Sequence, residues 1–105
     1  MGRTRLYIAG PMTGLPNYNL DNFRAAEAQL QAAGYGAVNP GRRGVIEGYT
    51  WVDYMKLGIA DLLTCGAVAT LPDWEMSRGA SIEVSLAQDL EMDVRSLADW
   101  LELGD

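Results

Sequence analysis

Short apolar runs alternate along the chain with stretches whose apolar residues recur every three or four positions. The first pattern is typical of strands buried on both faces, and the second of helices with one apolar side. The apolar runs cover residues 4–9, 35–39, 67–71 and 92–95. The helical stretches cover residues 20–33, 51–63, 77–91 and 97–103. This alternation predicts strand–helix units and a parallel sheet covered by helices.

Residues suited to capping stand before the expected helices. They are Asn19, Thr50, Ser77 and Ser96. Their side-chain oxygens can accept free N–H groups of a first helical turn. Gly34 ends the first helix and Pro40 stops the second strand. Residues 41–49, GRRGVIEGY, are therefore expected to form a loop.

The length predicts a single domain over residues 1–105, with a three-layer α/β architecture. We expect a Rossmann-like parallel sheet in the flavodoxin-like order 2-1-3-4, with helices on both faces. In such sheets ligands bind beyond the carboxyl ends of the strands, where the strand order reverses. The loops after the first and third strands include residues 10–14, GPMTG, and 73–79, DWEMSRG. Both loops should therefore border one crevice.

Composition narrows the classes of partner and chemistry. With a formal net charge of −6, the chain lacks the basic surface that binding to a nucleic-acid polymer or an anionic membrane requires. The chain has no histidine and one cysteine, Cys65, which excludes histidine-dependent catalysis and an intramolecular disulfide. We expect no metal and no other cofactor. Without a long apolar run or a signal-like start, the sequence predicts a cytoplasmic protein.

The stretch from Leu71 to Ala87 holds the most suggestive chemistry. Ser77 can cap the following helix, Gly79 would let a ligand approach the backbone, and Glu83 lies on the stripe that should face the sheet. A charged carboxylate on the buried side of a helix is unusual, and one interpretation is that it has a role in binding or catalysis. The simpler interpretation is a glutamate near a helix start that complements the helix dipole, and this stretch alone leaves both open.

Three motifs together resemble the nucleoside 2-deoxyribosyltransferase superfamily. They are YIAGPMTG at residues 7–14, the pair Asp53 and Asp61, and Ser77-x-Gly79-x-x-x-Glu83 with Ala87 four residues on. The likeness covers residues 4 to about 95. The likeness is greatest to small phage and bacterial proteins that start with the same YIAGPMTG motif and to 2′-deoxynucleoside 5′-phosphate N-hydrolases.

The resemblance implies roles for individual residues. Glu83 matches the nucleophile that attacks the anomeric carbon, Tyr7 a tyrosine near it, and Asp53 an acid that holds the sugar. These three are the implied catalytic residues. The implied substrate-binding residues are Gly10, Pro11, Met12, Thr13, Ser77, Arg78 and Gly79.

The residue six positions before the glutamate separates two branches of that superfamily. Transferases usually carry aspartate there, whereas the 5′-monophosphate N-hydrolases carry a serine that helps to bind phosphate, as at Ser77. A hydroxyl beside helix N–H groups suits a phosphate, which an aspartate would repel. Thr13 stands where the N-hydrolases place a phosphate-binding arginine. Arg78 or Arg42 could replace that charge.

Structural alternatives accompany these assignments. Tyr7 is a possible core residue, Asp53 a complement to its helix start, and Asp61 a partner of backbone or of a neighbouring subunit. The candidate base-stacking aromatics, which are more often core or interface, are Trp51, Trp74 and Tyr18.

The favoured interpretation is a nucleotide- or nucleoside-binding protein that cleaves the N-glycosidic bond of a (deoxy)nucleoside 5′-monophosphate. The alternatives are a protein that sequesters a nucleotide signal without turnover, a nucleoside deoxyribosyltransferase, and an interaction module with an inactive site. We expect a homodimer or a higher homo-oligomer, because the chain is short and rich in large apolar residues.

Overall fold

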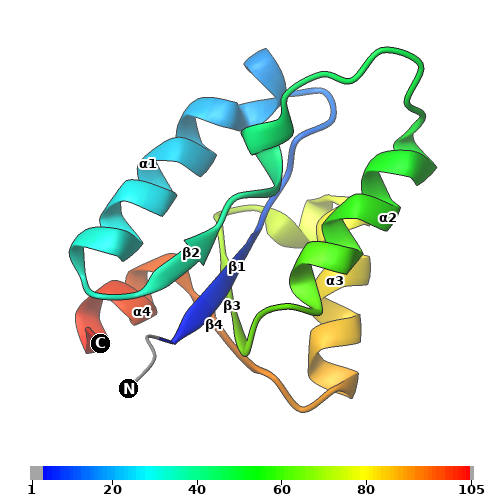
Figure 1. Ribbon diagram of the computed structural model, residues 1–105. Coiled ribbons are helices and arrows are strands. Elements are labelled where there is room, and N and C mark those ends of the chain that lie inside the picture. Colours follow the sequence, from blue (N-terminus) through cyan, green and yellow to red (C-terminus); the bar gives the residue numbers. More distant parts are fainter. Residues whose placement is uncertain (1–3, 105) are drawn as a thin grey trace.

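Four parallel strands form the centre of the protein (Figure 1). A computed structural model describes residues 4–104. The strands are β1 (Arg5–Ala9), β2 (Gly36–Val38), β3 (Ala67–Thr70) and β4 (Asp93–Ser96). Their order is β2-β1-β3-β4, and each neighbouring pair is parallel. This confirms the predicted α/β fold, including the strand order.

Two pairs of helices cover the sheet (Figure 1). The helices are α1 (Leu20–Ala32), α2 (Trp51–Leu62), α3 (Arg78–Asp89) and α4 (Leu97–Leu103). One face packs against α1 and α4, and the other packs against α2 and α3. Short 3-10 turns precede α1 (Pro16–Asn19), follow β2 (Pro40–Arg43) and precede α3 (Trp74–Met76). None of the helices within residues 4–104 is long and apolar enough to cross a membrane.

Alternate residues of β1 serve two separate cores, because successive side chains of a strand point to opposite faces. Leu6 and Ile8 are fully buried on the side of α1 and α4. Tyr7 and Ala9 are buried on the side of α2 and α3. A polar hydroxyl thus enters the α2–α3 core at Tyr7.

Three of the four predicted caps are confirmed. Thr50 forms a capping box with Asp53, Ser77 Oγ accepts the Ala80 N–H, and Ser96 Oγ accepts the Asp99 N–H. The cap predicted at Asn19 is wrong as a side-chain contact. Asn19 occupies the N-cap position of α1 in a left-handed conformation, and its Nδ2 donates to the Pro11 carbonyl at 2.9 Å instead.

Trp100 of α4 is buried within its own chain. Its indole N–H donates to the Val68 carbonyl at 2.8 Å, and its ring meets Tyr35 edge-on at 5.6 Å. The Tyr35 hydroxyl donates to the Trp100 carbonyl at 2.9 Å. Trp100 therefore gives no support to a subunit interface at α4.

Candidate functional site

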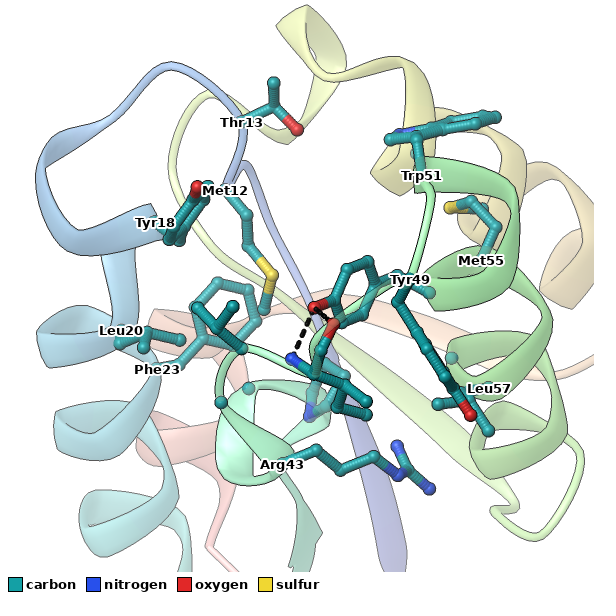
Figure 2. Close-up of a pocket in the computed structure, with 18 of the residues that line it drawn as sticks. Met12, Thr13, Tyr18, Leu20, Phe23, Arg43, Tyr49, Trp51, Met55 and Leu57 are labelled. Atoms are coloured by element: carbon teal, nitrogen blue, oxygen red, sulfur yellow. Dashed lines mark hydrogen bonds between the residues drawn. The ribbon is translucent and has the colours of Figure 1, made fainter.

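A cavity of about 490 Å³ lies at the carboxyl end of the sheet (Figure 2). We call it the main cavity. The loop after β1, the segment 40–49 after β2, and the helices α2 and α3 all line it. The predicted crevice between the first and third strands is therefore present, and the segment after β2 adds another wall. Its volume is within the range of small-molecule sites, roughly 300–1,000 Å³.

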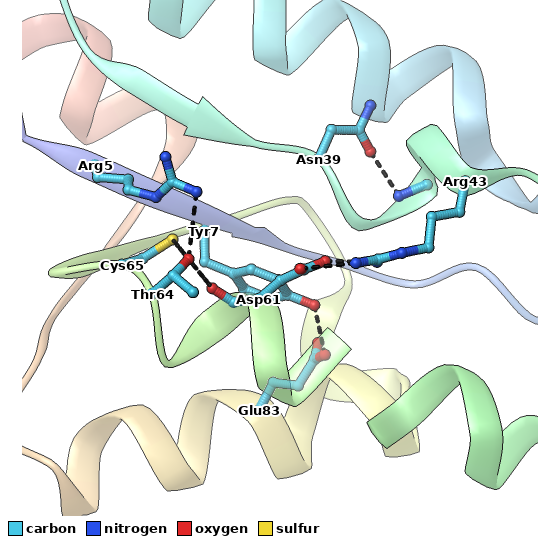
Figure 3. Close-up of polar contacts among 9 residues, drawn as sticks. Arg5, Tyr7, Asn39, Arg43, Asp61, Thr64, Cys65 and Glu83 are labelled. Carbon is cyan, nitrogen blue, oxygen red and sulfur yellow. Dashed lines mark hydrogen bonds and ion pairs between the residues drawn. The ribbon is translucent and has the colours of Figure 1, made fainter. Parts of the chain in front are cut away.

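Glu83 lines this cavity, and the residue is only 8% exposed. Glu83 belongs to the buried stripe of α3, together with Ala80, Val84 and Ala87. Tyr7 is fully buried in β1, and its hydroxyl donates a hydrogen bond of 2.5 Å to Glu83 Oε2 (Figure 3). The inward glutamate expected from the helical spacing therefore meets the tyrosine that enters the same core.

Burial sets the ionisation of this pair. Loss of solvent raises the pKa of Glu83 from 4.5 to about 7, and the Asp61 charge also raises it, while the hydrogen bond from Tyr7 lowers it. Burial, together with the Glu83 charge, raises the pKa of Tyr7 well above its usual value. Tyr7 thus stays a protonated donor at neutral pH, and Glu83 is the group that titrates there.

Gly58 of α2 makes room for the pair. A Cβ atom at this position would lie 2.6 Å from Glu83 Oε2 and 3.0 Å from the Tyr7 hydroxyl oxygen. Glycine inside a helix costs roughly 0.5–1 kcal/mol relative to alanine, so its presence there points to a close approach. The sequence analysis did not select Gly58. The unfavourable free energy of a glycine inside a helix was the signal in the sequence that could have identified Gly58.

Arg43 is a cavity residue that the sequence analysis also missed. It comes at the end of the 3-10 turn after β2, and its guanidinium holds both oxygens of Asp61 on α2 at 2.6 and 2.9 Å (Figure 3). Asp61 therefore contacts a side chain of its own chain rather than backbone. The pair ties segment 40–49 to α2, and it balances the Asp61 charge near Glu83.

Most of the predicted site residues meet at the main cavity, and three do not. The predicted residues that line it are Tyr7, Gly10, Met12, Thr13, Ser77, Gly79 and Glu83. Pro11 and Arg78 instead border a more open groove beside it, which we call the side groove. Thr13, Ser77 and Gly79 line both hollows, so the two meet there.

Asp53 is half-buried and does not line the main cavity. Its Oδ2 accepts hydrogen bonds from the Thr50 backbone N–H at 2.9 Å and from the Thr50 hydroxyl at 3.0 Å. These bonds lower the pKa of Asp53, the backbone bond most. Its contacts are those of a helix cap, and its role in holding a sugar stays a prediction.

The two arginines considered as phosphate ligands have other partners. Arg42 forms an ion pair with the buried Glu27, with Nη2 2.5 Å from Oε2. The Arg78 guanidinium lies 4.4 Å from the ring centroid of Trp51, which joins the starts of α3 and α2. Arg78 thus stands at the rim, and Arg42 serves the packing of the 3-10 turn against α1.

Aromatic side chains form facing walls of the main cavity (Figure 2). Tyr18 lies on one side, and Tyr49 and Trp51 lie on the other. Trp74 packs instead against the core under α2 and α3. Tyr18 stands in a left-handed run with Asn17 and Asn19, with φ of 49°, 52° and 62° at residues 17–19. Such strain at non-glycine residues is concentrated at functional sites.

The chain belongs to the family described as a domain of unknown function, DUF4406, which matches residues 4–96. A comparison with curated proteins gives no match. The family match spans both loops of the main cavity and Glu83, but its description states no activity.

Proposed function

We propose that the protein binds a (deoxy)nucleoside 5′-monophosphate in the main cavity and cleaves its N-glycosidic bond, with Glu83 as the nucleophile. One observation carries this proposal: a buried carboxylate lines a cavity of suitable size and is held by a tyrosine hydroxyl. Tyr7 engages Oε2, so Oε1 is the oxygen that would attack. The resemblance of the motifs at residues 7–14 and 77–87 supports the same chemistry.

In the first step Glu83 Oε1 attacks the anomeric carbon, and the bond from that carbon to the base nitrogen breaks. The electron pair leaves with the base, and a base that is neutral in the nucleotide takes up a proton from solvent water as it leaves. Water then attacks the anomeric carbon, releases the Glu83 carboxylate and gives up a proton. The transition states resemble an oxocarbenium cation, which a close carboxylate stabilises and then traps.

The attack requires ionised Glu83. With a pKa of about 7, Glu83 is ionised in about half of the free protein at neutral pH. The rate of base release at low substrate concentration should therefore rise with pH through about 7. A fall over the same range would assign Glu83 to general acid catalysis instead.

The start of α3 supports a phosphate at the other end of the ligand. Ser77 Oγ accepts the Ala80 N–H at 3.2 Å, so the hydroxyl proton can be donated to an anion. Glu83 comes six positions after Ser77, which corresponds to roughly 9 Å along the helix axis. A ligand that reaches both residues needs the length of a sugar phosphate.

The test is base release from a panel of nucleoside monophosphates, followed by chromatography. Wild type should release base from at least one of them, and Glu83→Gln should release none while binding the same compound. Glu102→Gln, which removes the same charge from the exposed surface of α4, serves as the control. Absence of release from every common ribose and deoxyribose monophosphate, and from a monophosphate with a pyridinium base, would refute the hydrolase proposal.

Binding without turnover is the second candidate. It is favoured by the raised pKa of Glu83, because the neutral carboxyl is a poor nucleophile. Tight binding of a nucleotide by calorimetry, with no base released above pH 8, would establish it. Formation of a new nucleoside when a second free base is added would indicate a deoxyribosyltransferase.

We also infer that the protein forms a homodimer or a higher homo-oligomer. Large apolar side chains are exposed on α2 at Val52, next to it at Leu63, and near α3 at Met76. A domain of this size gains stability from covering such residues. Light scattering should return a mass above 11.4 kDa at micromolar concentration, and a monomer mass would refute the inference.

A further inference from the structure

The charges around the main cavity do not balance. Apart from tyrosines, the ionisable side chains that line it within residues 4–104 are Arg43, Glu47 and Glu83. Arg43 is neutralised by its two contacts with Asp61. The remaining charges are negative. Solvent screens the charge of the exposed Glu47, whereas the charge of ionised Glu83 is buried and screened less.

The aromatic walls of the main cavity also favour a positively charged ligand. The aromatic rings of Tyr18 and Tyr49 line the cavity from opposite sides (Figure 2), whereas the Trp51 ring already has the Arg78 guanidinium as its cation partner. Ring faces attract cations within about 6 Å of their centre, and the attraction grows when water is excluded. Planar cations gain from both the rings and the carboxylate, whereas neutral bases gain only from stacking.

We infer that the main cavity is selective for nucleotides whose base is a positively charged heteroaromatic ring, such as a pyridinium, over nucleotides with a neutral base. This inference rests on the proposed function and specifies its substrate class. The start of α3, which carries the positive end of a helix dipole near Ser77, is suited to the anionic phosphate of the same ligand. The site thus matches a ligand that carries a positive charge on its base, near Glu83, and a negative charge on its phosphate, near the start of α3.

The leaving-group chemistry agrees with this selectivity. When the bond between the anomeric carbon and a pyridinium nitrogen breaks, the electron pair neutralises the ring, and no proton has to be delivered. Neutral bases would leave as anions unless an acid protonated them. The chain has no histidine, Glu83 is the nucleophile, and the Tyr7 hydroxyl donates to Glu83. The described lining is therefore suited to a base that leaves without a proton.

A bound cation should also change the ionisation of Glu83. Burial raises the pKa of this carboxyl most, the hydrogen bond from Tyr7 of β1 lowers it, and the charge of Asp61 on α2 raises it. Arg43, which follows β2, pairs with Asp61. Burial raises the pKa of Glu83 by more than the hydrogen bond from Tyr7 lowers it, so no positive charge compensates for the burial of the carboxylate. A ligand cation supplies that charge and lowers the pKa. By linkage, a ligand that promotes ionisation binds more tightly when the group is already ionised.

The experiment uses a matched pair of ligands that cannot be cleaved. Carbocyclic nicotinamide mononucleotide has a carbon in place of the ring oxygen of the sugar and a cationic base, and its dihydro form has the same shape but a neutral base. Dissociation constants of both are measured by calorimetry at pH 6 and pH 8. The proteins are wild type, Glu83→Gln and Glu102→Gln, which controls for net charge.

We expect wild type to bind the cationic form at least about tenfold more tightly at pH 8, and the ratio to fall at pH 6. Glu83→Gln should lose most of the preference at both pH values, while Glu102→Gln should keep it. Equal affinity for the two forms, a preference that survives in Glu83→Gln, or no binding of either form would overturn the inference.

Failure of this inference can be told apart from failure of the proposed function. The calorimetric result does not depend on catalysis, because neither ligand has a glycosidic bond. If neutral-base monophosphates release base while the cationic preference is absent, the inference is wrong and the hydrolase proposal stands. If the preference is present but no mononucleotide releases base, the selectivity stands and the hydrolase proposal is wrong.

Discussion

Replacing Tyr7 by phenylalanine tests the pair at the centre of the site. The substitution removes the hydroxyl that donates to Glu83 Oε2 at 2.5 Å, while the fully buried ring keeps its packing. A hydrogen bond to a charged group contributes about 1.5–3 kcal/mol, and 1.36 kcal/mol corresponds to a tenfold change in a protonation equilibrium. The pKa of Glu83 should therefore rise from about 7 to roughly 8 or above.

The assay is a carbon-13 NMR titration of glutamate carboxyl groups. The signal of Glu83 is identified by its absence from Glu83→Gln. Tyr35→Phe is the matched control, because it removes another buried tyrosine hydroxyl, which donates to the Trp100 carbonyl on the opposite face of the sheet. In that variant the Glu83 midpoint should stay near the wild-type value. An unchanged or lower midpoint in Tyr7→Phe would refute the assigned hydrogen bond.

Glu83→Gln should stabilise the protein at pH 8. Because the pKa of this carboxyl rises from 4.5 to about 7 on folding, its contribution to stability is full below pH 4.5, and about 3 kcal/mol of it is lost as the pH rises from 4.5 to 7. Urea unfolding that showed the same pH dependence in both proteins would contradict this. Gly58→Ala should lower activity or ligand affinity by about 100-fold through displacement of the carboxylate, whereas Gly66→Ala, whose added Cβ meets nothing within 4 Å, should not. Ser77→Ala should weaken a nucleoside monophosphate by about 1–2 kcal/mol in calorimetry and the matching nucleoside hardly at all. Equal losses would mean that Ser77 is only a helix cap.

Local patterns were sufficient to predict the sheet and three of the helix caps. Buried parallel strands are short apolar runs, and capping side chains contact residues only three positions away, so both are visible in the sequence. Asn19 is the exception, because its side chain bonds the Pro11 carbonyl across a loop. Glu83 could be predicted to face the sheet from helical spacing, and its neighbour Tyr7 from the motif that it begins.

The parts that could not be predicted depend on contacts between distant segments. Arg43 and Asp61 are 18 residues apart, and nothing local in the loop distinguishes Arg43 from Arg42. Only the folded chain shows that Arg42 meets Glu27 while Arg43 borders the cavity. Gly58 could not be predicted for a similar reason. The space that a Cβ atom would occupy at this position is filled by side chains from β1 and α3.

The central claim is that Glu83 forms a covalent bond to the sugar. It is tested most directly by mass spectrometry of the protein after acid quench, with a nucleoside monophosphate whose 2′-fluorine slows hydrolysis of the intermediate. The account predicts a mass increase equal to the fluorinated sugar phosphate, located on the peptide that contains Glu83 and absent in Glu83→Gln. Base release without an adduct, or an adduct on a different residue, would contradict it.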